Sequence, residues 1–135
     1  MSDTYLEIPA TAAIRLSANP RLLSVIPTDT TRSAKEMLDK IFLACGLNPH
    51  EEASIFVCSP PQSVVANIPS GAKGLRIAVF GLSPKQIGTL WSVPMYQWIS
   101  VGEHFWCFAE RLEHIEADIE KKKHLWNCLK ILREV

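Results

Sequence analysis

Apolar and polar residues alternate in short blocks along the chain, and the lengths of these blocks predict its secondary structure. Short apolar runs that are bounded by proline, glycine or polar residues are typical of buried strands. Four such runs occur, at residues 21–26, 54–58, 75–80 and 104–108. The last run is a candidate to pair with residues 96–101 as a hairpin across the turn at Gly102 and Glu103.

The segment from Ala34 to Cys45 has the clearest helical pattern. Its apolar residues recur every three or four positions, which places them on one face of a helix. Ser33 and Glu36 have the spacing of a capping box at its start, and Gly46 supplies a left-handed residue at its end. This helix is the best-specified local element of the sequence.

Two further helical segments follow. Ser83 and Pro84 suit the N-cap and first position of a short helix, and residues 110–135 have a helical pattern in two pieces, the second capped by Asp118. Strands and helices thus alternate, which predicts an α/β fold with a short, mostly parallel four-stranded sheet and helices on both faces. Ligands bind such sheets at the carboxyl ends of the strands, here residues 27–32, 59–62, 81–83 and 109–110.

Residues 1–20 have no sustained period, so we predict an N-terminal arm at residues 1–20 and a single α/β domain at residues 21–135. The arm contains apolar side chains that a solvated tail does not need. Either they cover part of the core, or they anchor the arm to a partner when it binds. The candidate anchors are Tyr5, Leu6, Ile8, Ile14 and Leu16.

The composition limits the class of protein. A hydrophobic content of 47% with 21% charged residues excludes a disordered chain. Fourteen basic and fourteen acidic side chains cancel, which disfavours a strongly basic nucleic-acid binder but leaves a local patch open. No apolar run approaches the ~18 residues that span a bilayer, and the first residues lack the features of a secretion signal. We therefore expect a cytoplasmic protein.

The predicted carboxyl-end loops lack catalytic motifs. Residues 27–32 contain no glycine, which excludes the common phosphate-binding turns, and Asp29 is their only acid, expected to be an exposed loop residue. The four cysteines include no CxxC pair, so we predict buried thiols, no metal site and no cofactor. His124 and Cys128 face the same side of the last predicted helix, but two ligands do not make a metal site. No set of residues meets the requirements of catalysis, and we predict a protein that is not an enzyme.

Two groups of side chains are candidates for contacts with partners. Trp91, Trp98 and Trp106 fall within sixteen residues, and large aromatics anchor many interfaces. We therefore take Trp91 and Trp98 as candidate partner-binding residues, for example in a homodimer, the alternative being burial in the core. Candidate contacts with phosphate or an acidic partner are Lys121, Lys122 and Lys123, whose alternative role is to complement a helix dipole.

Four stretches resemble, in order and spacing, the psi subunit family of bacterial DNA polymerase III. They are residues 19–26, which read Asn-Pro-Arg-Leu-Leu-Ser-Val-Ile, residues 43–50, which read Leu-Ala-Cys-Gly-Leu-Asn-Pro-His, the connector at residues 60–69, and residues 117–126. The resemblance covers most of residues 19–130. Its most distinctive motif is Leu125-Trp126 after a charged helix start.

The resemblance implies the three-layer α/β/α architecture of uracil-DNA glycosylases without their chemistry. Residues 75–83 are similar to the glycosylase strand that ends in a glycine. The glycosylase loop that activates water contains glycine and proline, whereas residues 27–31 contain proline alone, and no His-Pro-Ser type of motif follows Phe108. The implied protein therefore has the scaffold of a DNA-base enzyme and lacks its reactive groups.

The same resemblance implies a role in assembly. Psi subunits join the clamp loader through an N-terminal segment and hold the chi subunit, which contacts single-stranded-DNA-binding protein. Residues 1–20 would then be the clamp-loader-binding arm, although this arm has a single arginine, Arg15, where the family has several and a tryptophan. The alternatives are a degenerate or active DNA-base enzyme that uses Asp29, and a homodimeric interaction module of unrelated function.

Overall fold

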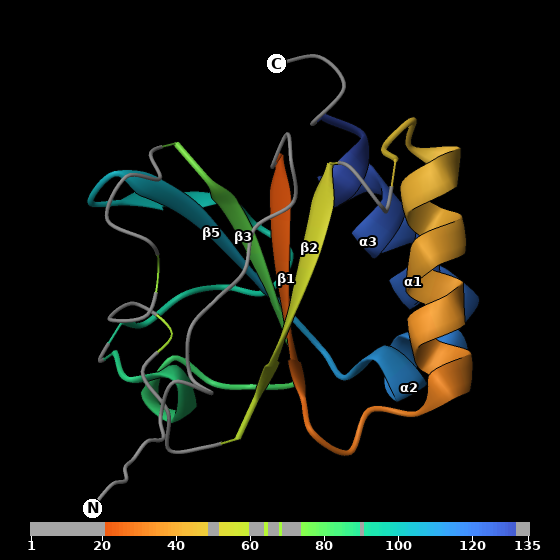
Figure 1. Cartoon of the computed structure of the whole chain (residues 1–135), viewed down its shortest axis with the longest axis horizontal. Coiled ribbons are helices and arrows are strands. Elements are labelled where there is room, and N and C mark those ends of the chain that lie inside the picture. Colours follow the sequence, from red (N-terminus) through yellow and green to blue (C-terminus); the bar gives the residue numbers. More distant parts are fainter. Residues whose placement is uncertain are drawn as a thin grey trace, which may run out of the picture.

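The computed structural model describes residues 21–48, 52–59, 64, 68, 74–89 and 91–131 of the 135-residue chain (Figure 1). The predicted arm at residues 1–20, with its five candidate anchors, lies outside the described residues. The elements in chain order are β1 (Leu22–Pro27), α1 (Arg32–Ala44), β2 (Ala53–Cys58), β3 (Arg76–Phe80), the 3-10 helix η3 (Lys85–Ile87), β4 (Ile99–Val101), β5 (His104–Ala109), α2 (Leu112–Glu116) and α3 (Ile119–Lys130).

The strands form one mixed sheet in the order β2-β1-β3-β5-β4. The four strands that the apolar runs predict pair in parallel, and the short strand β4 adds to β5 in antiparallel orientation. The predicted α/β class is confirmed, and so is the hairpin across Gly102. The predicted count of four strands is one too low, because β4 joins the sheet through residues 99–101 of the segment 96–101.

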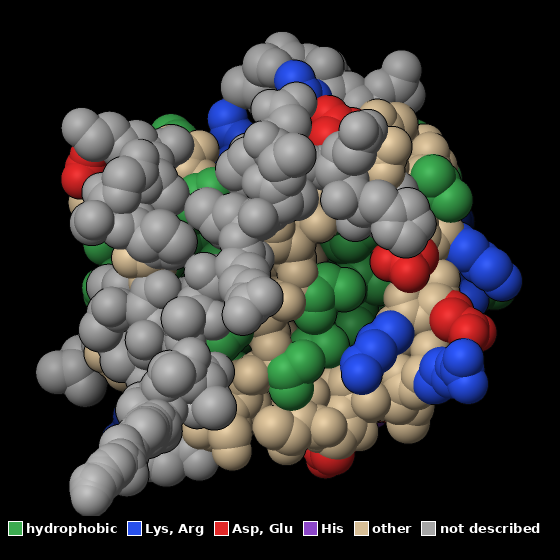
Figure 2. Space-filling model, in the orientation of Figure 1, with side chains coloured by type: hydrophobic (Ala, Val, Ile, Leu, Met, Phe, Trp, Pro, Cys, Tyr) green, Lys and Arg blue, Asp and Glu red, His purple; other side chains and the backbone are tan. Residues whose placement is uncertain are grey.

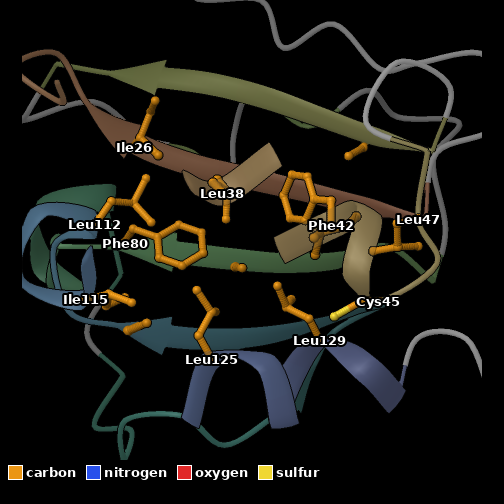
Figure 3. Packing of buried hydrophobic residues seen from close by; sticks show 14 of the residues in the cluster. Ile26, Leu38, Phe42, Cys45, Leu47, Phe80, Leu112, Ile115, Leu125 and Leu129 are labelled. Carbon is orange, nitrogen blue, oxygen red and sulfur yellow. The ribbon is translucent and has the colours of Figure 1, made fainter. Parts of the chain in front are cut away.

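The three α-helices lie on one face of the sheet (Figure 1). Their apolar side chains pack against those of β1 and β3 in one core cluster (Figure 3). A second cluster fills the other face, where η3 and the segments around it bring Leu82, Ile87 and Trp91 onto β3 and β5. Among the described residues, the α-helices therefore cover one face, and the second face is covered by the 3-10 helix η3 and otherwise irregular chain.

The start of α1 differs from the predicted capping box. Thr31 is the N-cap, and its side-chain oxygen accepts a hydrogen bond from the Ala34 N–H at 3.2 Å. The Ser33 hydroxyl lies inside the helix and forms a hydrogen bond with the Glu116 carboxylate of α2. A tertiary partner 83 residues away therefore takes the hydroxyl that the local pattern assigned to the helix end.

The later helix starts agree with the sequence pattern. Ser83 Oγ accepts from the Gln86 N–H at 3.2 Å, and Gln86 Oε1 accepts from the Ser83 N–H at 2.8 Å, which is the reciprocal arrangement of a capping box. Asp118 separates α2 from α3, and its Oδ1 accepts from the N–H groups of Glu120 and Lys121 at 2.9 and 3.3 Å. The predicted division of the last helical region into two pieces is confirmed.

Candidate functional site

The carboxyl ends of β1 and β3 form the place where an open α/β sheet usually binds a ligand. β1 has β2 on one side and β3 on the other, so the chain changes direction across the sheet between these neighbours. A crevice at such a switch point is the common ligand site of these folds. The loops that border it are residues 28–31 after β1 and residues 81–83 after β3.

Arg111 occupies this position. It follows β5, and its guanidinium Nη2 lies 3.0 Å from Asp29 Oδ1 in the loop after β1. Its side chain crosses the backbone of Gly81, because a methyl group at Gly81 would overlap Arg111 Cγ and lie 3.0 Å from Arg111 Cα. Arg111 thus links the ends of β5, β3 and β1.

Glu113 of α2 holds the same loop in place. Glu113 Oε2 accepts from the Thr31 N–H at 2.7 Å, and Glu113 Oε1 lies 3.5 Å from Arg111 Nη2. Partial burial of Glu113 opposes its ionisation, but the hydrogen bond from Thr31 and the charge of Arg111 outweigh it, so that its pKa is lower than usual. The carboxylate therefore stays charged and ties the loop after β1 to α2.

Asp29 is an exposed loop residue, as the sequence predicts. Its carboxylate pairs with Arg111, and its side chain is 72% exposed to solvent. The ion pair therefore joins the loop after β1 to the residue that follows β5 by two positions.

A hollow of about 260 Å³ lies next to Arg111, between the ends of β3 and β5. Its polar side chains already have structural partners. Ser83 caps η3, and Glu110 forms an ion pair with Lys121 at 2.7 Å and accepts from the Tyr96 hydroxyl at 3.2 Å. The hydrogen bond from Lys121 is the main cause that lowers the pKa of Glu110. His114 is the remaining titratable group of this lining and is exposed.

A second hollow, of about 290 Å³, lies between α3 and the segment that leads to β4. The Tyr96 and His124 rings meet edge to face across it, with their centroids 5.4 Å apart. Tyr96 has a φ of +60°, a backbone conformation that is uncommon for a bulky residue and that is often found at functional positions. His124 and Cys128 both line this hollow, which confirms that they face the same side of the helix.

The candidate tryptophans make internal contacts. The ring of Trp91 meets the buried ring of Trp106 edge to face, with centroids 4.9 Å apart. Trp98 Nε1 donates a hydrogen bond to the Cys128 carbonyl oxygen at 2.9 Å, so that it attaches the segment before β4 to α3. Trp91 and Trp98 are half-buried, and their role in binding a partner stays a prediction.

Two of the three candidate lysines form ion pairs within the fold. Lys121 pairs with Glu110 at 2.7 Å, and Lys123 pairs with Glu120 on its own helix at 3.6 Å. Successive residues of a helix point in directions about 100° apart, which separates Lys122 from both neighbours.

The site at the carboxyl edge of the sheet also includes two residues that the sequence pattern did not single out, Arg111 and Glu113. Arg111 directly follows residues 109–110, a loop that the pattern had marked as a place to look for ligands.

The comparisons with known proteins give no relative: no protein-family model matches the chain, and neither a curated protein nor a solved structure has a significant match to it. Within the described ranges, no three histidine, cysteine or acidic side chains come together as metal ligands. The described helices include none with the length and apolar character needed to cross a bilayer.

Proposed function

We propose that this protein is a non-catalytic interaction subunit, similar in role to the psi subunit that links the clamp loader to chi and single-stranded-DNA-binding protein. The observation that carries the proposal is the position of Arg111, which packs on Gly81 and forms ion pairs with Asp29 and Glu113 at the switch point of the sheet. We further propose the three-layer, glycosylase-like scaffold, which the two apolar clusters on opposite faces of the sheet support.

The main alternative is an active DNA-base enzyme. An enzyme that flips a base out of DNA needs a pocket for that base and a group that activates water. Here the only acid of the loop after β1 is paired with Arg111, and the hydroxyl and carboxylate beside the neighbouring hollow are paired as well. Incubation of the protein with uracil-containing DNA is therefore expected to release no uracil. Release that Asp29→Asn abolishes would overturn the proposal.

An exposed apolar strip on α3 supports an interaction role. Ile119 is 70% exposed and Trp126 is 40% exposed, and their spacing places them on the same side of the helix. The Lys130 ammonium lies 4.8 Å from the centre of the Trp126 ring, which adds a positive charge to this strip. Exposed tryptophans beside basic side chains are frequent energetic centres of interfaces, so α3 is the described surface best suited to a partner.

The experiment is a pull-down with purified clamp-loader subunits and chi protein as separate baits. We expect the full chain to be captured, and loss of residues 1–20 to abolish capture by the clamp-loader subunits but not by chi. Trp126→Ala is expected to weaken chi capture at least tenfold, whereas Leu43→Ala, which removes a still more exposed apolar side chain from α1, leaves it unchanged. Failure of the full chain to bind any of these baits would contradict the proposal.

A further inference from the structure

One side of α3 combines exposed apolar and basic side chains. The helix is fixed from its inner side, where Leu125 and Leu129 point into the core (Figure 3). At about 100° per residue, four other side chains of α3 lie within about 60° of one another around the helix axis. These four, all exposed to solvent, are Ile119, Lys123, Trp126 and Lys130. Together they form the α3 strip.

The α3 strip is positively charged. Both of its ionisable residues are lysines, and the single acid of α3, Glu120, points about 100° away from Ile119. Glu120 pairs with Lys123 at 3.6 Å, but the two side chains are 72% and 69% exposed, and ion pairs this exposed are weak. The lysines are therefore available to the carboxylates of a partner, and the strip attracts a partner of negative charge.

The apolar residues of the strip indicate what kind of negative partner fits. Ile119 and Trp126 are seven residues apart, which is about 10 Å along the helix axis. A second helix presents its own apolar side chains at the same spacing of two turns. A nucleic-acid strand fits less well, because it offers little apolar surface to Ile119, which is 70% exposed. The Lys130 ammonium also lies over the Trp126 ring, where a base would stack.

We propose that the α3 strip binds an acidic amphipathic helix of a partner protein. This helix lays two apolar side chains, two turns apart, against Ile119 and Trp126, and it places carboxylates beside the two lysines. The apolar contacts supply most of the affinity, and the charges select the partner. The inference rests on the proposed interaction role and deepens it by naming the chemistry of the segment that α3 receives.

The experiment measures the fluorescence anisotropy of a labelled peptide mixed with the full chain. The peptide has about fifteen residues, enough to form a helix, with two leucines seven positions apart, glutamates beside them and alanine elsewhere. We expect it to bind, and expect Trp126→Ala to weaken the binding about tenfold. Two matched peptides, one with lysine for each glutamate and one with alanine for both leucines, are also expected to bind about tenfold more weakly. Equal binding of either matched peptide would refute the proposal.

A charge reversal in the chain locates the site. Lys130→Glu is expected to weaken binding of the acidic peptide about fivefold and to strengthen binding of the lysine peptide. Lys40→Glu makes the same change of charge at an exposed position of α1 and should alter neither affinity. Equal effects of the two substitutions would show that the net charge of the molecule, and not the α3 strip, selects the peptide.

Two parallel measurements separate this inference from its alternatives. If an oligothymidylate of the same charge binds in a Trp126-dependent manner and the acidic peptide does not, the strip is a nucleic-acid surface and the inference is wrong. If chi protein is captured and the acidic peptide does not bind, the proposed function stands and the inference fails. If the peptide binds as expected and neither chi nor the clamp-loader subunits are captured, the inference stands and the proposed function fails.

Discussion

Gly81 shows how one residue permits the ion-pair arrangement at the carboxyl edge of the sheet. Its φ is +70°, and the Arg111 side chain packs directly on its α-carbon. Gly102 in the β4–β5 turn has a similar φ of +64°, but nothing lies within 4 Å of the position of its missing methyl group. The two glycines therefore separate the cost of a left-handed backbone from the cost of displacing Arg111.

We expect Gly102→Ala to lower the free energy of unfolding by about 1 kcal/mol, the usual penalty of a left-handed non-glycine residue. Gly81→Ala is expected to cost more than this, because the methyl group also pushes Arg111 away from Asp29. Urea unfolding of both variants measures the difference. Equal losses would show that Arg111 moves aside without cost and does not hold the site.

Ser24 in β1 gives a second test at this scale. Its side chain is fully buried, and among the described residues its Oγ is the one buried side-chain oxygen or nitrogen without a hydrogen-bond partner. Removal of an unpaired buried hydroxyl relieves a desolvation penalty of about 1–3 kcal/mol. We therefore expect Ser24→Ala to leave the free energy of unfolding unchanged or to raise it.

Thr30→Val is the matched comparison for Ser24→Ala. Thr30 is also buried, but its Oγ1 donates to the Pro27 carbonyl oxygen at 2.8 Å. The replacement keeps the shape and removes this hydrogen bond, so it should lower the free energy of unfolding by about 1 kcal/mol. Urea unfolding is again the measurement, and a larger loss for Ser24→Ala than for Thr30→Val would refute the assignment of an unpaired hydroxyl.

Single residues were predictable from the sequence where the deciding neighbours are local. The glycine that ends β3 and the exposure of Asp29 follow from turn chemistry and loop position. The pairing of Arg111 with Asp29 does not, because the two residues are 82 positions apart and meet only after β1, β3 and β5 align. Long-range ion pairs leave no pattern in a single sequence.

Among the helix starts, those that depend on neighbouring residues were predictable from the sequence, and the one that depends on a distant residue was not. Asp118 and Ser83 cap the helices that the sequence assigned to them, whereas Ser33 does not. The local pattern assigned the N-cap to Ser33, whereas the structure places it two residues earlier, at Thr31. The Ser33 hydroxyl bonds instead to Glu116 of α2, a tertiary contact that the local pattern does not contain.

The N-cap of α3 is expected to contribute measurably to stability. Asp118 Oδ1 accepts from two N–H groups of the first turn, so Asp118→Ala should lower the free energy of unfolding by about 1 kcal/mol. Asp118→Asn keeps an acceptor in the same place and should lose less. The two variants are compared by urea unfolding followed by far-ultraviolet circular dichroism. Equal losses would mean that the charge of Asp118, rather than its hydrogen bonds, stabilises α3.

At the scale of the whole molecule, the sequence predicted the class and the parallel strands but not the distribution of the helices. Parallel strands that are covered on both faces have continuous apolar runs, which β1 and β3 display. The segments that cover each face of the sheet could not be predicted in the same way. The second face is packed by isolated side chains such as Leu82, Ile87 and Trp91 from η3 and irregular chain, and these have no periodic pattern to detect. Figure 2 shows one face of the molecule, with apolar side chains exposed among charged ones.

The carboxylates that join β5, α2 and α3 predict how the stability of the whole molecule depends on pH. Lys121, bonded to Glu110, is the main cause that lowers the pKa of Glu110, and the pKa of Glu113 is also below its usual value. A group whose pKa is lower in the folded state stabilises the fold fully above its unfolded value, about 4.3 for glutamate. That contribution is lost as the pH falls through the lower, folded value.

We therefore expect the urea midpoint of the wild type to fall between about pH 6 and about pH 3, and Glu110→Gln to fall less over the same interval, because it has no carboxylate to protonate. Glu36→Gln is the matched control, since its partner Arg32 is 3.6 Å away and both side chains are largely exposed, so it should follow the wild type. Identical pH profiles for Glu110→Gln and the wild type would mean that the ion pair with Lys121 does not stabilise the junction of β5 and α3. In that case the lowered pKa of Glu113 would account for the pH effect, and Glu113→Gln would be the variant whose urea midpoint falls less between about pH 6 and about pH 3.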